Sequence, residues 1–230
     1  MERAARIRYN NLALFPYPGD PAAMLGAKLD IPKYIARLHE EIDRVDHSEI
    51  QQMADWIFEA WEQDKFVYVF GNGGSGTTAT HISEDLGKSS LRECDLQDES
   101  KQRLKIMSLT DNLGWILAVG NDCGYDQIFV QQLMNYGRPG DLAIGISGSG
   151  NSANVLKAVD WANRHGLRTF GLTGFKGGKL KQMQQAGLHV PLDDMGMVES
   201  IHLALFHWVL NDVFARINQE GRHAEALAAR

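Results

Sequence analysis

Five short apolar segments alternate with helical stretches, and this alternation constrains the fold of the chain more than any other feature of its sequence. Unbroken runs of apolar, β-rich residues are typical of parallel strands that are buried on both faces. The predicted strands are residues 65–70, 104–109, 141–146, 167–173 and 188–192, and the predicted helices between them are residues 77–86, 113–119, 151–164 and 179–185. We therefore expect an α/β fold: a doubly wound, flavodoxin-like parallel sheet between two layers of helices.

The segments outside this alternation are also patterned. Residues 31–63 repeat apolar side chains at three- and four-residue steps, which predicts two N-terminal helices with Ser48 as a possible cap of the second. A last helix at 197–217 is apolar all round, so we expect it to be central or buried in an oligomer. Residues 89–103 are polar and predict a surface loop. The expected domain organisation is an N-terminal extension at 1–30, a single domain at 31–217 and a C-terminal tail at 218–230.

Composition excludes several classes of protein. The chain of 230 residues has 29 acidic and 23 basic residues, a net charge of −6, which disfavours nucleic acid as the main ligand. It lacks a signal-peptide core and any apolar run of the roughly 20 residues that a membrane helix needs. Its two cysteines, Cys94 and Cys123, are far apart and form no C-x-x-C motif. These features predict reduced thiols in a cytoplasmic protein.

The first chemical motif is G71-N-G-G-S-G76, which follows a predicted strand and precedes a predicted helix. Glycines there let backbone N–H groups approach an anion, and the helix N-terminus adds positive partial charge. The spacing also matches G-x-G-x-x-G, but no acidic residue closes a second strand about 20 residues further on, which argues against a dinucleotide site. Residues 174–179 lack the spacing of a phosphate-binding P-loop.

The second motif is S147-G-S-G-N-S152, again between a strand and a helix. An N-cap of the following helix would explain one serine in this motif, but it would not explain three serines together with two glycines. Small hydroxyls and helix-start N–H groups can bind a phosphate monoester without Arg or Lys. Because both motifs follow the carboxyl ends of strands, we expect them to line one crevice at that edge of the sheet.

Two helices carry polar groups suited to a metal or to acid–base chemistry. His81 and Asp85 are four residues apart and share a helix face, with Glu84 as a rival carboxylate. By themselves they could equally be a solvated pair. On the apolar last helix, Glu199, His202 and His207 need partners, and we expect His202 to be a core histidine bonded to backbone carbonyl groups.

These motifs, taken in order, resemble those of the sugar isomerase (SIS) domain family over about residues 31–217. The motifs are GNGGS, H-x-x-x-D, GNDCGYDQIF (120–129), GISGSGNSANV and ES-I-H-x-x-x-x-H. Within it the chain is similar to the isomerases of sedoheptulose 7-phosphate. The resemblance implies a homotetramer with sites at subunit contacts and a sugar-phosphate substrate. It also implies a divalent metal, zinc above all, on His81, Asp85, Glu199 and His207. The implied substrate-binding residues are Asn72, Gly73, Gly74, Ser75, Asn121, Asp122, Ser147, Gly148, Ser149, Ser152 and Glu199.

The chain departs from the family pattern at three of these positions. Asp85 stands where the family usually has Glu, Glu199 where it has Gln, and Gly148 where it has Thr. Two imidazoles and two carboxylates suit zinc but also manganese, iron or nickel. The departures leave open whether Asp85 or Glu199 moves the carbon-bound proton while His207 serves the oxygens.

The expected function is aldose–ketose isomerisation through an enediol, in which Ser75 and the three serines of the second motif hold the phosphate. A non-catalytic sugar-phosphate-binding regulator or scaffold of the same fold, and an isomerase of another sugar phosphate, are the alternatives. The resemblance also implies that His81, Asp85 and His207 are retained together, which argues against a pure scaffold.

Overall fold

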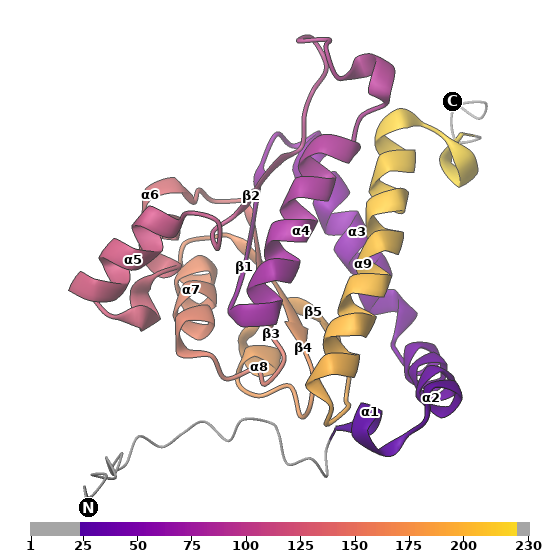
Figure 1. Ribbon diagram of the computed structural model, residues 1–230. Helices are drawn as coiled ribbons and strands as arrows, with labels where there is room; N and C mark the ends of the chain where they lie inside the picture. Colours follow the sequence, from indigo (N-terminus) through magenta and orange to yellow (C-terminus); the bar gives the residue numbers. More distant parts are fainter. Residues whose placement is uncertain (1–23, 225–230) are drawn as a thin grey trace, which may run out of the picture.

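The computed structural model describes residues 24–224 and contains one five-stranded parallel sheet (Figure 1). Its strands are β1 (Phe66–Gly71), β2 (Lys105–Ser108), β3 (Leu142–Ser147), β4 (Arg168–Thr173) and β5 (Ala186–His189), in the order β2-β1-β3-β4-β5. The predicted sheet is therefore confirmed. The bounds predicted for the last strand were wrong, because it pairs from Ala186 onward and ends before Pro191, which has no N–H to donate.

The strand order places the ends of β1 and β3 next to each other. The chain proceeds from β1 outward to β2 and then returns to the other side of β1 to form β3. Gly71 at the end of β1 is paired in register with Ile146, one residue before the end of β3. Ligands of open α/β sheets bind where the strand order reverses in this way. The glycine and serine motifs thus emerge side by side at the carboxyl edge of the sheet.

Helices cover both faces of the sheet (Figure 1). On one face, apolar side chains of α3, α4 and α9 form a continuous core with the strands, and on the other face α6, α7 and α8 do so. The helices are α1 (Leu25–Lys28), α2 (Ile31–Asp43), α3 (His47–Glu62), α4 (Gly73–Ser89), α5 (Leu113–Asp122), α6 (Val130–Tyr136), α7 (Ala153–Arg164), α8 (Leu180–Met183) and α9 (Met195–Asn218). This doubly wound arrangement is the one that the sequence predicts.

Three local features differ from expectation. Helix α3 is capped by Asp46, whose carboxylate accepts hydrogen bonds from the backbone and side chain of Ser48. Helix α4 begins at Gly73 and not at Thr77, since Gly76 N–H already donates to Asn72 O at 3.2 Å. Helix α6 was not predicted; its segment has only a short apolar pattern, and it packs on α7.

The segments around the domain are described only in part. The extension predicted at 1–30 includes residues 1–23, which lie outside the described residues, and the tail includes 225–230, which do so too. Residues 89–103 form a mostly exposed loop with one 3-10 turn, η1 (Glu93–Asp95). Another 3-10 turn, η3 (Gly221–His223), follows α9. No helix within 24–224 is long and apolar enough to cross a membrane.

Candidate active site

The glycine motif forms the bare start of α4. Asn72 is the N-cap residue, but its side chain makes no capping hydrogen bond, and Gly73 and Gly74 in the first turn are exposed. Gly73 has a φ of +54°, a conformation that favours glycine. The N–H groups of this turn therefore have no side chain of their own to cover them. Ser75 is only 7% exposed and packs against Gly71, beneath the turn.

The serine motif forms the neighbouring loop between β3 and α7. Ser147 ends the strand and Ser152 is the N-cap residue of α7, and their hydroxyl oxygens lie 3.0 Å apart. Ser149 between them is exposed. A Cβ at Gly148 would overlap Sδ and Cε at the end of the Met195 side chain, at the start of α9, so a larger residue there would require Met195 to move. The hydroxyls and the helix start of α7 form a second anion-suited surface beside the first.

Glu199 lies over the glycine motif. It comes from the second turn of α9, and its carboxylate is so close to Gly74 that any Cβ at that glycine would overlap it. The side chain is half-buried, and this burial raises the pKa of Glu199 above the ordinary value. None of the causes of the shift is a cation. A carboxylate held in this way is a stronger base than an exposed glutamate.

His81, Asp85 and His207 form a second polar cluster. Asp85 Oδ2 lies 3.0 Å from His81 Nε2 and 3.8 Å from His207 Nε2, so the carboxylate stands between two imidazoles from α4 and α9. The imidazole rings meet edge to face with centroids 5.3 Å apart. One donor atom of each side chain lies within 4.8 Å of the others, and all three residues are partly exposed. This donor set of two nitrogens and one oxygen fits a divalent metal.

Glu199 does not belong to this cluster. Helices α4 and α9 lie side by side (Figure 1), with Glu199 beside Gly74 and His207 beside Asp85. His207 is eight residues beyond Glu199 on α9, which corresponds to about 12 Å along the helix axis. Of the four proposed metal ligands the structure therefore brings three together and keeps the fourth at the glycine motif.

The other candidate residues are divided between surface and core. Asn121 and Asp122 are exposed at the end of α5, where the amide of Asn121 donates to the carboxylate of Asp122 at 2.8 Å. His202 is 2% exposed, and its Nε2 lies 3.2 Å from the carbonyl oxygen of Thr173. Burial lowers the pKa of His202 to about 4. The interpretation of His202 as a core histidine is confirmed.

Two residues at the site were missed in the sequence. Asn154 on α7 and Tyr125 in the 3-10 turn η2 (Tyr125–Gln127) both hydrogen-bond the side chain of Asn72. Asn154 could have been noticed, because a polar residue stands beside Val155 on the face of α7 that packs on the sheet. No comparable signal in the sequence marks the contact of Tyr125 with Asn72.

Comparison with known proteins places this site in a family. The model of the SIS domain matches residues 32–174, more than half of the chain. The phosphoheptose isomerase of Rhodospirillum rubrum is 40% identical over 137 residues, which are 60% of this chain and 69% of that protein. The phosphoheptose isomerase of Chlorobium phaeobacteroides is 34% identical over 196 residues, which are 84% and 83% of the two chains.

A solved structure agrees with these sequences. The phosphoheptose isomerase from Francisella tularensis superposes with a TM-score of 0.70 at 28% identity, covering 83% of this chain and 97% of that one. The chain belongs to the SIS domain family and, within it, to the group that contains the phosphoheptose isomerases. Its carboxyl-edge loops, Glu199 and the His–Asp cluster are thus the candidate active site of a sugar-phosphate isomerase.

Proposed function

We propose that the chain interconverts sedoheptulose 7-phosphate and D-glycero-D-manno-heptose 7-phosphate through an enediol. In the direction from ketose to aldose, a base removes a proton from C1 and returns it to C2, while the proton of the C1 hydroxyl moves to the oxygen on C2. The observation that carries this proposal is the half-buried carboxylate of Glu199, which has no ion-pair partner within residues 24–224 and lies over the exposed helix start at Gly74, beside a second loop suited to phosphate. The family membership supports the same reaction.

Substrate binding is assigned to the two loops. Ser147, Ser149 and Ser152, with the N–H groups at the start of α7, hold the phosphate, and this binding energy orients the reacting carbons. The exposed first turn of α4 and the pair Asn121 and Asp122 contact the sugar hydroxyls. Ser75 packs against Gly71 beneath this turn, so we assign it to the support of the turn instead of the phosphate contact that the sequence suggested.

Glu199 is the proposed shuttle of the carbon-bound proton. It lies closest to the turn that holds the sugar, and its raised pKa favours proton abstraction. Asp85 is less suited to this role, because its oxygen faces two imidazoles. When no cation occupies its Nε2, His207 carries the proton that moves between the oxygens, with Asp85 as the group that orients it.

The same cluster would hold a metal. His81, Asp85 and His207 would bind a divalent cation, for which we propose zinc, since two imidazoles and a carboxylate are the ligands of many catalytic zinc sites. When bound, the cation supplies Lewis-acid polarisation of the substrate carbonyl group. Because Asp85 lies between the two imidazoles, the three donor atoms are close enough together to bind one cation.

We also propose that the protein is a cytoplasmic homotetramer with sites at subunit contacts. The two turns of helix between Glu199 and His207 support this, because a second copy can bring its own cluster to the loops of the first. Exposed apolar side chains on α2 and α5, such as Ile31 (76%) and Leu113 (65%), offer contact surfaces. Cys94 and Cys123 are both exposed and free, as expected in a reducing compartment.

Proton exchange tests the reaction. The protein is incubated with sedoheptulose 7-phosphate in D2O, with and without zinc, and NMR follows deuterium at C1 and the aldoheptose product. We expect both signals in the wild type and loss of product in His207→Ala, with binding of the sugar phosphate retained. Full activity of His207→Ala would remove the acid–base role, whereas binding without exchange in the wild type would favour the non-catalytic regulator. Exchange only with a shorter sugar phosphate would favour another isomerase.

Subunit complementation tests the shared site. Glu199→Gln and His207→Ala are each expected to be inactive, and we expect the two variants to regain activity when they are coexpressed, because some sites then combine an intact Glu199 with an intact His207. Two copies of one variant serve as the control. If mixed oligomers form and stay inactive, the site lies within one chain.

A further inference from the structure

Asn72 forms an amide pair with Asn154 between the glycine and serine motifs. Its Nδ2 donates to Asn154 Oδ1 at 2.9 Å, and Asn154 Nδ2 donates back to Asn72 Oδ1 at 2.8 Å. Asn72 follows β1 and begins α4, while Asn154 lies in the first turn of α7, just after the serine motif. Asn154 is 2% exposed, so the pair is anchored in the core. It therefore ties the glycine motif directly to the helix that carries the phosphate loop.

The direction of these hydrogen bonds is fixed by the backbone. Val155 N–H donates to Asn154 Oδ1 at 2.9 Å, and a backbone N–H can only be a donor. The oxygen of Asn154 must therefore face this N–H and Asn72 Nδ2, which leaves its amide group for the oxygen of Asn72. The orientation of Asn72 follows from that of Asn154.

Tyr125 adds a third segment to the pair. Its hydroxyl donates to Asn72 Oδ1 at 3.0 Å, although the side chain is 60% exposed. The next residue, Asp126, forms an ion pair with Lys157 on α7. The turn η2 is thus attached to both α4 and α7, and it directly follows the segment that carries Asn121 and Asp122.

The hydrogen-bonding capacity of Asn72 is therefore almost exhausted. An amide oxygen accepts two hydrogen bonds and an amide nitrogen donates two. Both acceptor sites of Asn72 are filled, by Asn154 and Tyr125, and one of its two N–H bonds is used. Asn72 can offer a ligand one N–H and no acceptor from its side chain.

We propose that Tyr125 and Asn154 are positioning residues of the isomerase. They orient Asn72 so that it presents a single N–H donor to a sugar oxygen, and they hold the glycine motif, the phosphate loop and the Asn121–Asp122 segment in one geometry. Neither residue needs to touch the substrate for this role. The proposal rests on the proposed function, since it concerns the same site.

A double-mutant cycle tests the proposal through kcat and KM. Tyr125→Phe removes one hydroxyl from an exposed side chain, so the fold is not at risk, and we expect kcat/KM to fall about 5-fold, as for the loss of one neutral hydrogen bond. In an Asn72→Ala background the same change should cost less than about 2-fold, because the hydroxyl then has nothing to orient. A full effect in that background means that Tyr125 contacts the substrate itself and overturns the positioning role.

The buried member of the pair is tested in parallel. Asn154→Ala should lower kcat/KM about 50-fold, since small misplacement of a loop is costly, while Asn163→Ala, at the other end of α7, is the matched control. Asn163 also makes side-chain hydrogen bonds, to Met183 and Thr169, and should leave kcat/KM within about 2-fold of the wild type. Unchanged kinetics in both Asn154→Ala and Tyr125→Phe contradict the proposal.

Hydrogen exchange separates this proposal from the proposed function. Residues 119–129 should exchange amide protons faster in Tyr125→Phe and in Asn154→Ala than in the wild type, but not in Tyr136→Phe, a control at another exposed tyrosine. An inactive wild type would overturn the proposed function, and the exchange rates would still decide whether Tyr125 holds this segment. Equal exchange in the wild type and Tyr125→Phe would overturn the inference even if the enzyme is active.

Discussion

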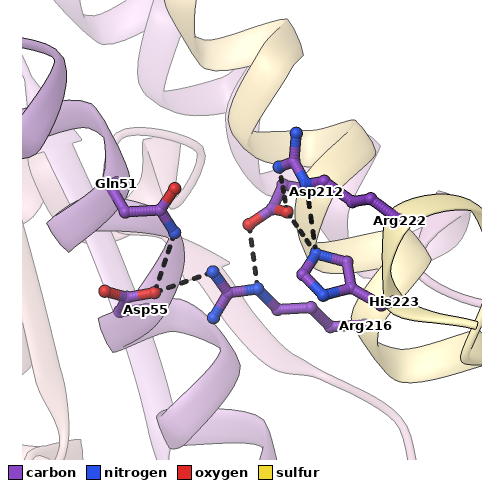
Figure 2. Close-up of polar contacts among 6 residues, drawn as sticks. All are labelled: Gln51, Asp55, Asp212, Arg216, Arg222 and His223. Atoms are coloured by element: carbon purple, nitrogen blue, oxygen red, sulfur yellow. Dashed lines mark hydrogen bonds and ion pairs between the residues drawn. The ribbon is translucent and has the colours of Figure 1, made fainter. Parts of the chain in front are cut away.

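Helix α9 carries two partly or fully buried carboxylates that differ in every other respect. Glu199, near its beginning, lies against the glycine motif, and burial raises the pKa of Glu199 with no cation among the causes of the shift. Asp212, near its end, has a side chain that is fully buried and is surrounded by Arg216, Arg222 and His223 (Figure 2). Among residues 24–224, one helix therefore holds an acid with no ion-pair partner near its beginning and an acid with several near its end.

The partners of Asp212 explain its opposite behaviour. Burial by itself raises the pKa of Asp212, but hydrogen bonds from His223 and Arg222 and the charge of Arg216 outweigh it, so the pKa lies below the ordinary value. Arg216 also reaches Asp55 on α3 at 2.7 Å. These contacts attach η3 and α3 to the end of α9 (Figure 2). Loss of a carboxylate that several cations share would leave those cations unpaired and destabilise the fold, whereas a carboxylate beside the glycine motif with a raised pKa is a candidate for chemistry.

The largest effect is expected at Glu199. Glu199→Gln keeps the shape of the side chain and removes the base, so kcat should fall about 1000-fold. The melting temperature should stay the same or rise, because a half-buried charge no longer has to be desolvated. Deuterium exchange at C1 measures the step directly. If the variant keeps its turnover, as the glutamine of the family pattern would suggest, Asp85 is the group that moves the carbon-bound proton.

The reverse outcome is expected at Asp212. Asp212→Ala leaves Arg216 and Arg222 without their shared anion and should lower the free energy of unfolding by about 3 kcal/mol, with kcat of the folded fraction within about 2-fold of the wild type. Urea unfolding measures the free energy of unfolding, and the isomerase assay on the same sample measures kcat. A loss of kcat at unchanged stability would show that the two ends of the helix do not differ as we describe.

The sequence predicted the sheet better than the site. Strands β1 to β4 were found because short apolar, β-rich runs have few other interpretations. His81 and Asp85 share a helix face by spacing alone. The contact of Glu199 with Gly74 depends on how two helices more than 100 residues apart pack together, which no local pattern records.

The Asp212 cluster was missed for a related reason. It needs the chain to turn back after α9, at Gln219, a non-glycine residue with a φ of +56°, so that Arg222 and His223 face the helix that they follow. A tail with a polar, Ala-rich composition predicts fraying or a short helix, such as η3, but not its return toward α9. His207 was placed beside Asp85 only by the family resemblance, since neither spacing nor periodicity connects α4 with α9.

His202, a buried histidine of α9, makes the free energy of unfolding depend on pH. The pKa of His202 is about 4 in the folded chain because of burial, against an ordinary value of 6.5. Between these values the unfolded chain binds more protons, so the stabilisation is complete above pH 6.5 and is lost as the pH falls to about 4. The full difference corresponds to about 3 kcal/mol. His202→Asn should flatten this part of the curve of unfolding free energy against pH, and an unchanged slope would contradict the assignment.

The smallest effect is expected at the rim of the Asp212 cluster. Arg222 pairs with Asp212 and lies over the ring of Trp208, 4.7 Å from its centroid, but its side chain is 52% exposed. Because solvent screens such a contact, Arg222→Gln should cost only about 1 kcal/mol, and less at high salt. Arg222→Lys, which keeps the charge, is the control. If Arg222→Gln costs as much as Asp212→Ala, the buried carboxylate depends on this one arginine, and Arg216 and His223 are not sufficient to satisfy it.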